Sequence, residues 1–225
     1  MIRVGINGFG RIGRAIFRIN EENPLFKVVA INDIDSNIDN HAYLLKYDTV
    51  YGRFYGDVYL INDKMKIVVN DNPIKFYSYE NINDVCWESH DVDIIIDASG
   101  IQNNVLLCNE LIRTKKAKKA IVTFSPDDGI DHTIIFGVND KTYDPESHHV
   151  VSTSICDSNA SGPILKHLEN EFGIDHGFIT TLHPWLSYQN LLDGSLRSVE
   201  SPGHFWSDFS LGRASTESLI PKQTS

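Results

Sequence analysis

The sequence predicts an α/β protein built on a doubly wound, mainly parallel sheet. Short apolar runs alternate with segments of helical spacing along most of the first 150 residues. The first such unit, residues 2–33, reads as a strand, a helix and a strand in about 30 residues, the size at which parallel strands become possible. Strands that alternate with helices in this way indicate a parallel sheet with helices on both faces.

The first unit opens with "IRVGIN", residues 2–7, which we expect to form a short buried strand. A glycine turn over residues 8–13 runs into "RAIFRINEEN", where the apolar positions 12, 15, 16 and 19 have helical spacing. A second strand, "FKVVAIND", completes the unit.

Predicted antiparallel hairpins follow this unit, and alternating strands and helices then return. Residues 46–78 contain alternating Val, Ile and Tyr with Asn-Asp turns, which indicate antiparallel hairpins. The apolar runs "DVDIIIDASG" and "KKAIVTFS" then flank a helix at about 103–114, and "HTIIFGV" and "HHVVSTS" add two strands. Beyond a boundary near residue 150 we expect a helix from 162, a strand over "HGFITTLHPW" and a long loop over 194–213.

Composition limits the class of protein. The chain of 225 residues is 41% apolar with a formal net charge of −10, which suits a soluble protein and argues against general nucleic-acid binding. Its three cysteines lack Cys-x-x-Cys spacing, so we expect neither a disulfide framework nor a metal site. The N-terminus lacks a signal-peptide layout, and no apolar run approaches the ~18 residues of a membrane span. We therefore expect a cytoplasmic protein without a membrane partner.

The segment "GINGFGRIG" places Gly8-x-Gly10-x-x-Gly13 directly after a strand and before a helix, the context that a Rossmann dinucleotide motif requires. Gly8 allows the tight turn, Gly10 lets a pyrophosphate approach the backbone, and Gly13 permits close packing of helix on strand. Asp33 is placed to take the ribose hydroxyls and would repel a 2′-phosphate, so NAD is predicted over NADP. The alternative is a turn that serves only helix packing, with Asp33 as a solvated strand end.

Cys156 stands where an apolar run gives way to a helix. There the helix dipole would stabilise its thiolate, the reactive form. His183, at the end of "GFITTLH", is a candidate partner that takes the thiol proton and serves as acid or base. Asn159 and the main-chain N–H of Cys156 are candidates for binding an oxyanion, and Asn159 is equally suited to cap the helix. The alternative is a buried structural cysteine and a structural histidine.

These residues lie in segments through which the chain resembles the glyceraldehyde-3-phosphate dehydrogenases and the related erythrose-4-phosphate dehydrogenases. Together the segments span nearly the whole chain in family order, and the first of them and "TTLH" are the most specific. They are "INGFGRIGR" at 6–14, "AINDI" at 30–34, "LLKYDTVYGRF" at 44–54, "DASG" at 97–100, "KKAIVTFS" at 118–125, "CDSN" at 156–159, "FGIDHGFITTLH" at 172–183 and "GRASTESLIP" at 212–221.

The resemblance implies a fold and a chemistry. The fold is an NAD-binding Rossmann domain, residues 1–151, followed by part of an α+β catalytic domain with an antiparallel sheet, residues 152–225. Cys156 attacks an aldehyde to give a thiohemiacetal, and His183 assists hydride transfer to NAD, which leaves a thioester on Cys156. The loop over 194–213 corresponds to one packed at a tetramer interface but is longer here. The cofactor site implied by the family pattern adds Arg11, Ile12, Ser99, Gly100 and Thr123 to Asp33.

Departures from the family pattern concern phosphate. The family has Ser-Cys-Thr-Thr-Asn where this chain has Ile-Cys-Asp-Ser-Asn, and Leu186 and Tyr188 replace threonines that hold the substrate phosphate. Asp157 would repel a phosphate by ~4 kcal/mol for unit charges 4 Å apart at an effective dielectric of about 20. Alternatively, Asp157 is a helix-start carboxylate stabilised by the dipole. Thr224 matches a phosphate-contacting threonine, but serine follows it where the family has glycine.

The resemblance ends part-way through the family's catalytic domain, so the chain is C-terminally truncated relative to that pattern. One interpretation is an NAD-dependent aldehyde dehydrogenase of carbohydrate metabolism, forming a homo-oligomer, with a phosphorylated sugar among its candidate substrates. Either phosphate or water would resolve the thioester, and Asp157 fits water better. The second interpretation is a non-catalytic NAD-binding or interaction protein.

Overall fold

The central strand of the fold is the apolar run at the N-terminus. A computed structural model describes residues 1–61, 65–153, 155–185, 189–194 and 212–220. The chain divides into two compact units, Met1–Lys166 and His167–Ser225. In the first unit the run forms β1 (Ile2–Asn7), which is buried from Val4 onward. A strand that is apolar and buried over most of its length belongs in the middle of a sheet covered on both faces.

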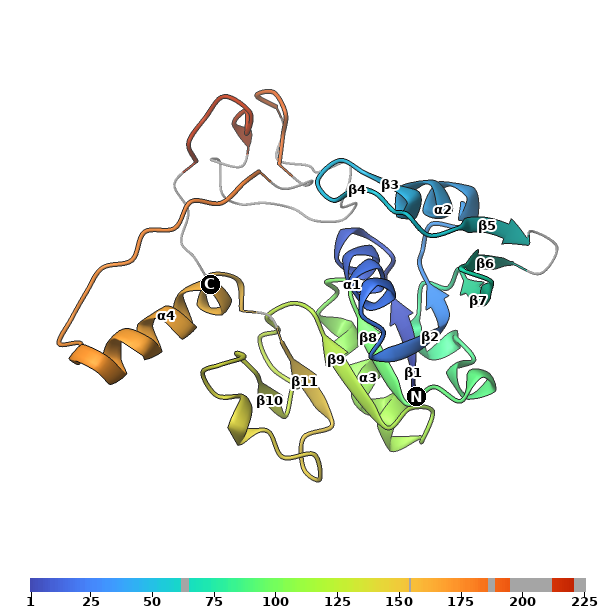
Figure 1. The fold of residues 1–225 in the computed structure, drawn as a ribbon, viewed down its shortest axis with the longest axis horizontal. Coiled ribbons are helices and arrows are strands. Elements are labelled where there is room, and N and C mark those ends of the chain that lie inside the picture. Colours follow the sequence, from blue (N-terminus) through green and yellow to red (C-terminus); the bar gives the residue numbers. More distant parts are fainter. Residues whose placement is uncertain (62–64, 154, 186–188, 195–211, 221–225) are drawn as a thin grey trace. The chain divides into compact units, whose positions relative to one another are not determined.

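In the described part of the chain, nine strands form one sheet in the order β10-β11-β9-β8-β1-β2-β7-β6-β5 (Figure 1). Neighbours from β10 to β7 are parallel, whereas β7, β6 and β5 pair antiparallel. Across the sheet, six of the parallel strands lie in the order β7, β2, β1, β8, β9 and β11, with the two-residue β10 set aside. Numbered by their order along the chain, they have the 3-2-1-4-5-6 arrangement of the Rossmann fold, which confirms the predicted fold class. Their bounds are β2 (Phe26–Asn32), β5 (Val58–Ile61), β6 (Lys66–Val69), β7 (Asn72–Tyr77), β8 (Ile94–Asp97), β9 (Lys119–Val122), β10 (His132–Thr133) and β11 (Val150–Ser152).

Helices cover both faces of this sheet. They are α1 (Arg11–Glu22), α2 (Ile38–Lys46) and α3 (Asn103–Arg113), and a small antiparallel sheet of β3 (Tyr47–Asp48) and β4 (Gly52–Arg53) follows α2. Successive residues of a strand point to opposite faces. Ile96 of β8 packs in one core cluster with Phe17 of α1 and Leu45 of α2, and Ile95 packs in the other with Leu111 of α3. The sheet is therefore doubly wound.

The residues of α1 that face the sheet are not all those that the apolar spacing predicted. Ile12 and Ile19 are 51% and 63% exposed, whereas Phe17 is fully buried. Gly13 also lies on the inner face, where a Cβ would be 2.1 Å from the carbonyl oxygen of Gly8, so only glycine fits against the turn that follows β1. Arg14 also faces inward, where its Nη1 donates to the carbonyl of Phe9.

Three expectations for the rest of the chain need correction. The antiparallel pairing over 46–78 is confirmed, but β7 also pairs parallel with β2 and is thus the third strand of the parallel set. The helix predicted from 162 is α4 (Cys156–Phe172) and begins earlier, with Pro163 inside it. The strand predicted over 176–185 is wrong, because the described residues 174–185 form no strand. A strand needs a hydrogen-bonded neighbour, and none pairs with this segment in the described part of the chain.

Candidate functional site

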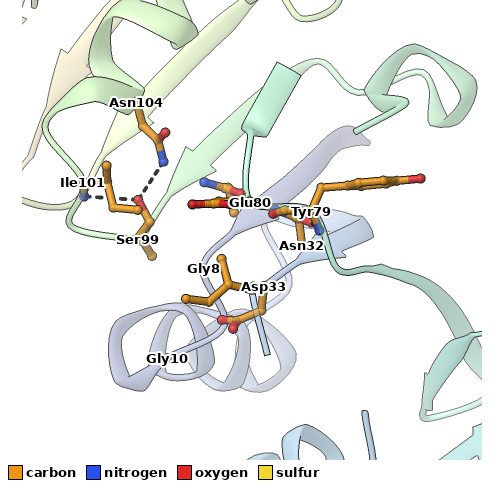
Figure 2. Close-up of a pocket in the computed structure, with 12 residues that line it drawn as sticks. Gly8, Gly10, Asn32, Asp33, Tyr79, Glu80, Ser99, Ile101 and Asn104 are labelled. Atoms are coloured by element: carbon orange, nitrogen blue, oxygen red, sulfur yellow. Dashed lines mark hydrogen bonds between the residues drawn. The ribbon is translucent and has the colours of Figure 1, made fainter. Parts of the chain in front are cut away.

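A pocket lies at the carboxyl ends of β1, β2 and β8, where the strand order of the sheet reverses. Open α/β sheets bind ligands at this point. In Figure 2, Ser99, Ile101 and Asn104 lie across from Tyr79 and Asn32, with the glycine turn below. The pocket measures about 200 Å³, less than the ~300–1,000 Å³ of sites that enclose a whole small ligand, so it suits one part of a dinucleotide. Its lining comprises Asn7, Gly8, Gly10, Asn32, Asp33, Ile34, Tyr79, Glu80, Ala98, Ser99, Ile101 and Asn104.

The three motif glycines have different surroundings. Gly8 has φ +88°, and a Cβ there would lie 2.6 Å from the main-chain nitrogen of Ser99. Gly13 is closed in by Gly8 itself, whereas nothing lies within 4 Å of a Cβ built on Gly10. Open space at Gly10 is what the approach of a pyrophosphate to the backbone requires.

The start of α1 presents unpaired N–H groups to this open space. Gly10 precedes the helix without a side-chain cap, and the first turn holds no acidic residue. The first turn therefore supplies no carboxylate of its own to these N–H groups, which together with the positive end of the helix dipole are suited to bind an anion from outside. The residues present thus fit the pyrophosphate of a dinucleotide.

Asp33 lies directly after β2 on the pocket wall, with a side chain that is 15% exposed. Its Oδ2 accepts a hydrogen bond from the main-chain N–H of Phe9, and its Oδ1 accepts one from the N–H of Asp35. These bonds leave each oxygen further lone pairs to accept from ribose hydroxyls. The position suits ribose binding.

Of the cofactor residues expected from the sequence, the pocket brings together Gly8, Gly10, Asp33 and Ser99. The others lie near this edge of the sheet without lining the pocket. Thr123, for example, follows β9, and its N–H donates to the carbonyl of Asp97 at the end of β8. The residues outside the lining are Arg11, Ile12, Gly13, Gly100 and Thr123.

Sequence analysis missed the wall formed by Tyr79 and Glu80. Interpreting residues 46–78 as hairpins hid the fact that β7 is parallel to β2, so that its carboxyl end reaches the same edge of the sheet. One feature of the sequence could have predicted this wall: the apolar strand ends at the polar residue Ser78, and the acidic residue Glu80 follows two positions later. The sequence also gave no direct sign of Asn104, which reaches the pocket from α3.

Cys156 is the first residue of α4 and is exposed. Asp157 follows it in the first turn, where a carboxylate is stabilised by the dipole. Asn159 lies inside the first turn rather than at the cap position, and its Nδ2 donates to the carbonyl of Thr153 at 3.0 Å. That bond uses one of the two N–H groups of the amide and leaves the other as a possible oxyanion donor.

His183 belongs to the second compact unit, in the stretch without a strand. Thr181 Oγ1 lies 3.2 Å from its Nε2. The pairing of this imidazole with Cys156 therefore stays a prediction. Some of the residues discussed above lie outside the described ranges: Leu186 and Tyr188, which replace phosphate-binding threonines of the family, Thr224, and most of the interface loop over 194–213.

Two absences within the described residues bear on the class of site. No group of three or more His, Cys, Asp or Glu side chains in the described ranges is placed to hold a metal ion. Nor does any helix in the part of the chain that the structure describes have the length and apolar character needed to cross a bilayer.

Comparisons with known proteins match both halves of the chain. Residues 2–105 match the family model for the glyceraldehyde 3-phosphate dehydrogenase NAD binding domain, and residues 155–225 match the model for the C-terminal domain of the same family. The chain is 38% identical over 224 residues to glyceraldehyde-3-phosphate dehydrogenase 2 of Streptomyces avermitilis. It is 36% identical over 223 residues to the glyceraldehyde-3-phosphate dehydrogenase of Geobacillus stearothermophilus. Each alignment covers 99% of this chain and 62% of the relative.

Proposed function

The chain belongs to the glyceraldehyde-3-phosphate dehydrogenase family, and on this basis we propose that it serves NAD-dependent oxidation of an aldehyde through a thioester on Cys156. Its cofactor is NAD. The observation that carries the proposal is that the pocket and Cys156 belong to one edge of one sheet. β11 is joined through parallel pairings to β1, so its carboxyl end, which leads to Cys156, faces the same way as the pocket strands.

Different residues of the pocket would bind different parts of NAD. Asp33 accepts hydrogen bonds from ribose hydroxyls, while the N–H groups at the start of α1 bind the pyrophosphate where Gly10 leaves room. When bound, NAD supplies an acceptor for the hydride that leaves the substrate carbon. The negative charge of Asp33 disfavours a phosphate on the 2′ position, which makes NAD the preferred form over NADP.

The reacting groups belong to the chain itself. The Cys156 sulfur, as thiolate at the start of α4, attacks the aldehyde carbon and forms a carbon–sulfur bond. His183, which has taken the thiol proton, gives it to the oxyanion that this attack creates and so forms the thiohemiacetal hydroxyl. It takes the same proton back as the hydride departs, which leaves a thioester on the cysteine. The second N–H of the Asn159 amide and the main-chain N–H of Cys156 stabilise the oxyanion.

Asp157 directs the second half of the reaction toward water. It is the residue next to Cys156 in the first turn of α4, and the proposal requires that its carboxylate lie close to the path of a nucleophile that approaches the thioester. Repulsion between like charges raises the free energy of an approaching inorganic phosphate and leaves water unaffected. The whole protein's substrate is thus an aldehyde whose thioester is hydrolysed, as in the erythrose-4-phosphate type.

The remaining parts of the proposal concern assembly and compartment. We assign a homo-oligomer, as the family resemblance implies, and a reducing compartment such as the cytoplasm, because the three cysteines are few and lack the spacing of a disulfide framework. Light scattering of the purified chain measures the first, and a monomer at all concentrations would contradict it.

An aldehyde panel tests the function. NADH formation is followed on the 225-residue chain, with and without inorganic phosphate, beside the Cys156→Ser variant. We expect turnover in the wild type, none in the variant, and little change on adding phosphate. Retained activity in the variant would end the thioester proposal, and strong acceleration by phosphate would show that Asp157 does not exclude it. NAD binding without turnover of any aldehyde would favour the non-catalytic interpretation.

A further inference from the structure

At the NAD pocket, buried polar side chains from three parallel strands are joined in a continuous line of hydrogen bonds. We propose that Asp97, Asn7 and Asn32 form a directional relay that holds the Tyr79 wall of the pocket in place, with Asp97 as a positioning residue. This inference rests on the proposed binding of NAD at this pocket. Asp97 ends β8 and does not itself line the pocket.

The contacts run from β8 through β1 to β2. Asn7 Nδ2 donates to Asp97 Oδ1 at 2.7 Å, and Asn32 Nδ2 donates to Asn7 Oδ1 at 2.7 Å. Asn32 then clasps the main chain of Tyr79 at two points. Its Oδ1 accepts from the Tyr79 N–H and its Nδ2 donates to the Tyr79 carbonyl, both at 2.9 Å. A side chain at the end of β8 is thus linked to the wall beyond β7.

The relay has a direction because its first member can only accept at Oδ1. An acceptor there turns the N–H₂ of Asn7 toward Asp97 and its oxygen toward Asn32, which in turn leaves the oxygen of Asn32 for the Tyr79 N–H. A reversed amide would set donor against donor. Asn7, Asn32 and Asp97 are 4%, 2% and 0% exposed, so water cannot relieve such a mismatch.

The direction holds in either protonation state of the carboxyl group. Burial raises the pKa of Asp97, against the opposing effect of hydrogen bonds from Asn7, Ser99 and Asn104. A proton on the group belongs on Oδ2, which is buried and has no hydrogen-bond partner in the described part of the chain. Oδ1 then remains the acceptor for Asn7.

The same oxygen also anchors the opposite wall. The main-chain N–H of Ser99 and Nδ2 of Asn104 each lie 3.4 Å from Asp97 Oδ1. Asn104 Nδ2 also donates to the Ser99 hydroxyl at 2.9 Å, the bond drawn in Figure 2. One buried acceptor therefore orients the Ser99 side and, through two amides, the Tyr79 side. Its loss should loosen a wall that it does not touch.

The test compares Asp97→Leu with the matched Asp97→Asn, whose amide oxygen still accepts from Asn7. Hydrogen exchange of the Tyr79 amide is measured by NMR on the full chain without cofactor, and the dissociation constant of NAD is measured by calorimetry. For Asp97→Leu we expect about tenfold faster exchange at Tyr79, the effect of losing the buried hydrogen bond from Asn7. We also expect about tenfold weaker NAD binding, to which the lost contacts of Ser99 and Asn104 with the same oxygen contribute. Asp97→Asn should stay near the wild type in both. The amide of Val68 in β6 should be unchanged in either variant.

The outcomes separate the relay from other roles. Equal effects in the two variants, or faster exchange at Val68 as well as at Tyr79, would overturn the relay in favour of general destabilisation. Should Asp97→Leu not fold, Asn7→Ala breaks the same line at its middle member and must raise exchange at Tyr79. If the wild type shows no NAD binding, the proposed function fails, while the exchange measurement still tests the relay.

Discussion

The carboxylate oxygen Oδ2 of Asp33 accepts a hydrogen bond from the main-chain N–H of Phe9 at 2.6 Å. The residue at the end of β2 therefore holds the turn between Gly8 and Gly10 as well as facing the pocket. A substitution at Asp33 has two effects, one on the charge seen by the cofactor and one on the shape of the turn, and the choice of replacement separates them.

Asp33→Asn keeps an oxygen that accepts from Phe9 and removes the charge. We expect the affinity for NADP to rise relative to NAD by about tenfold or more, because a like-charge contact with the 2′-phosphate disappears. Titration of both cofactors measures the ratio. Asp33→Ala, which also gives up the bond to Phe9, serves as the control and should weaken both cofactors. An unchanged ratio in Asp33→Asn would remove the ribose assignment.

Gly10 and Gly13 make a matched pair for substitution by alanine. A Cβ at Gly13 would lie 2.1 Å from the carbonyl of Gly8, so Gly13→Ala should lower the free energy of unfolding by about 1–3 kcal/mol or prevent folding. A Cβ at Gly10 meets nothing within 4 Å. Gly10→Ala should therefore cost less than about 1 kcal/mol in stability while weakening NAD binding. Urea unfolding and NAD titration check both, and a stable Gly13→Ala protein would contradict the close-packing role.

Alkylation distinguishes the cysteines. Cys108 is fully buried, and burial raises the pKa of its thiol, so it should not react with iodoacetamide in the folded protein. The informative comparison is between Cys86 and Cys156, which are both exposed. We expect Cys156 to be labelled faster and to be protected by NAD, with Cys86 unaffected by the cofactor. Peptide mass spectrometry measures the rates, and equal slow labelling of these two cysteines would favour the non-catalytic interpretation.

Stability should depend on pH through Asp97. Because burial raises the pKa of its carboxyl group, the folded chain keeps a proton that the unfolded chain releases above a pKa of about 3.9. Stability due to this proton is fully present below that value and is lost as the pH rises through the folded pKa. Asp97→Asn has no proton to lose at this position. As the pH is raised from about 4, its free energy of unfolding should therefore increase relative to that of the wild type. Urea unfolding across pH checks this, and a constant difference would refute it.

Local features of the sequence were enough to determine the fold class and the first half of the site. The dinucleotide-binding motif can be recognised within some 30 residues, because Gly8, Gly10 and Gly13 lie between a strand and a helix and Asp33 ends the next strand. Contacts this short in sequence depend on backbone geometry and residue type, and both can be read from the chain. The family resemblance extended the reading to Cys156 and His183, whose pairing remains a prediction.

Long-range pairing decided the rest. No local pattern shows that β7 pairs parallel with β2, yet this pairing brings Tyr79 and Glu80 to the pocket. Likewise, the spacing of the apolar residues of α1 does not show that Gly13 lies against Gly8 on the inner face of the helix. Asp97 and Asn7 are 90 residues apart and meet only because β8 lies beside β1. The sequence by itself determined which residues could bind a dinucleotide, and the sheet determined which of them share a wall, because partners of strands are chosen by packing over the whole domain.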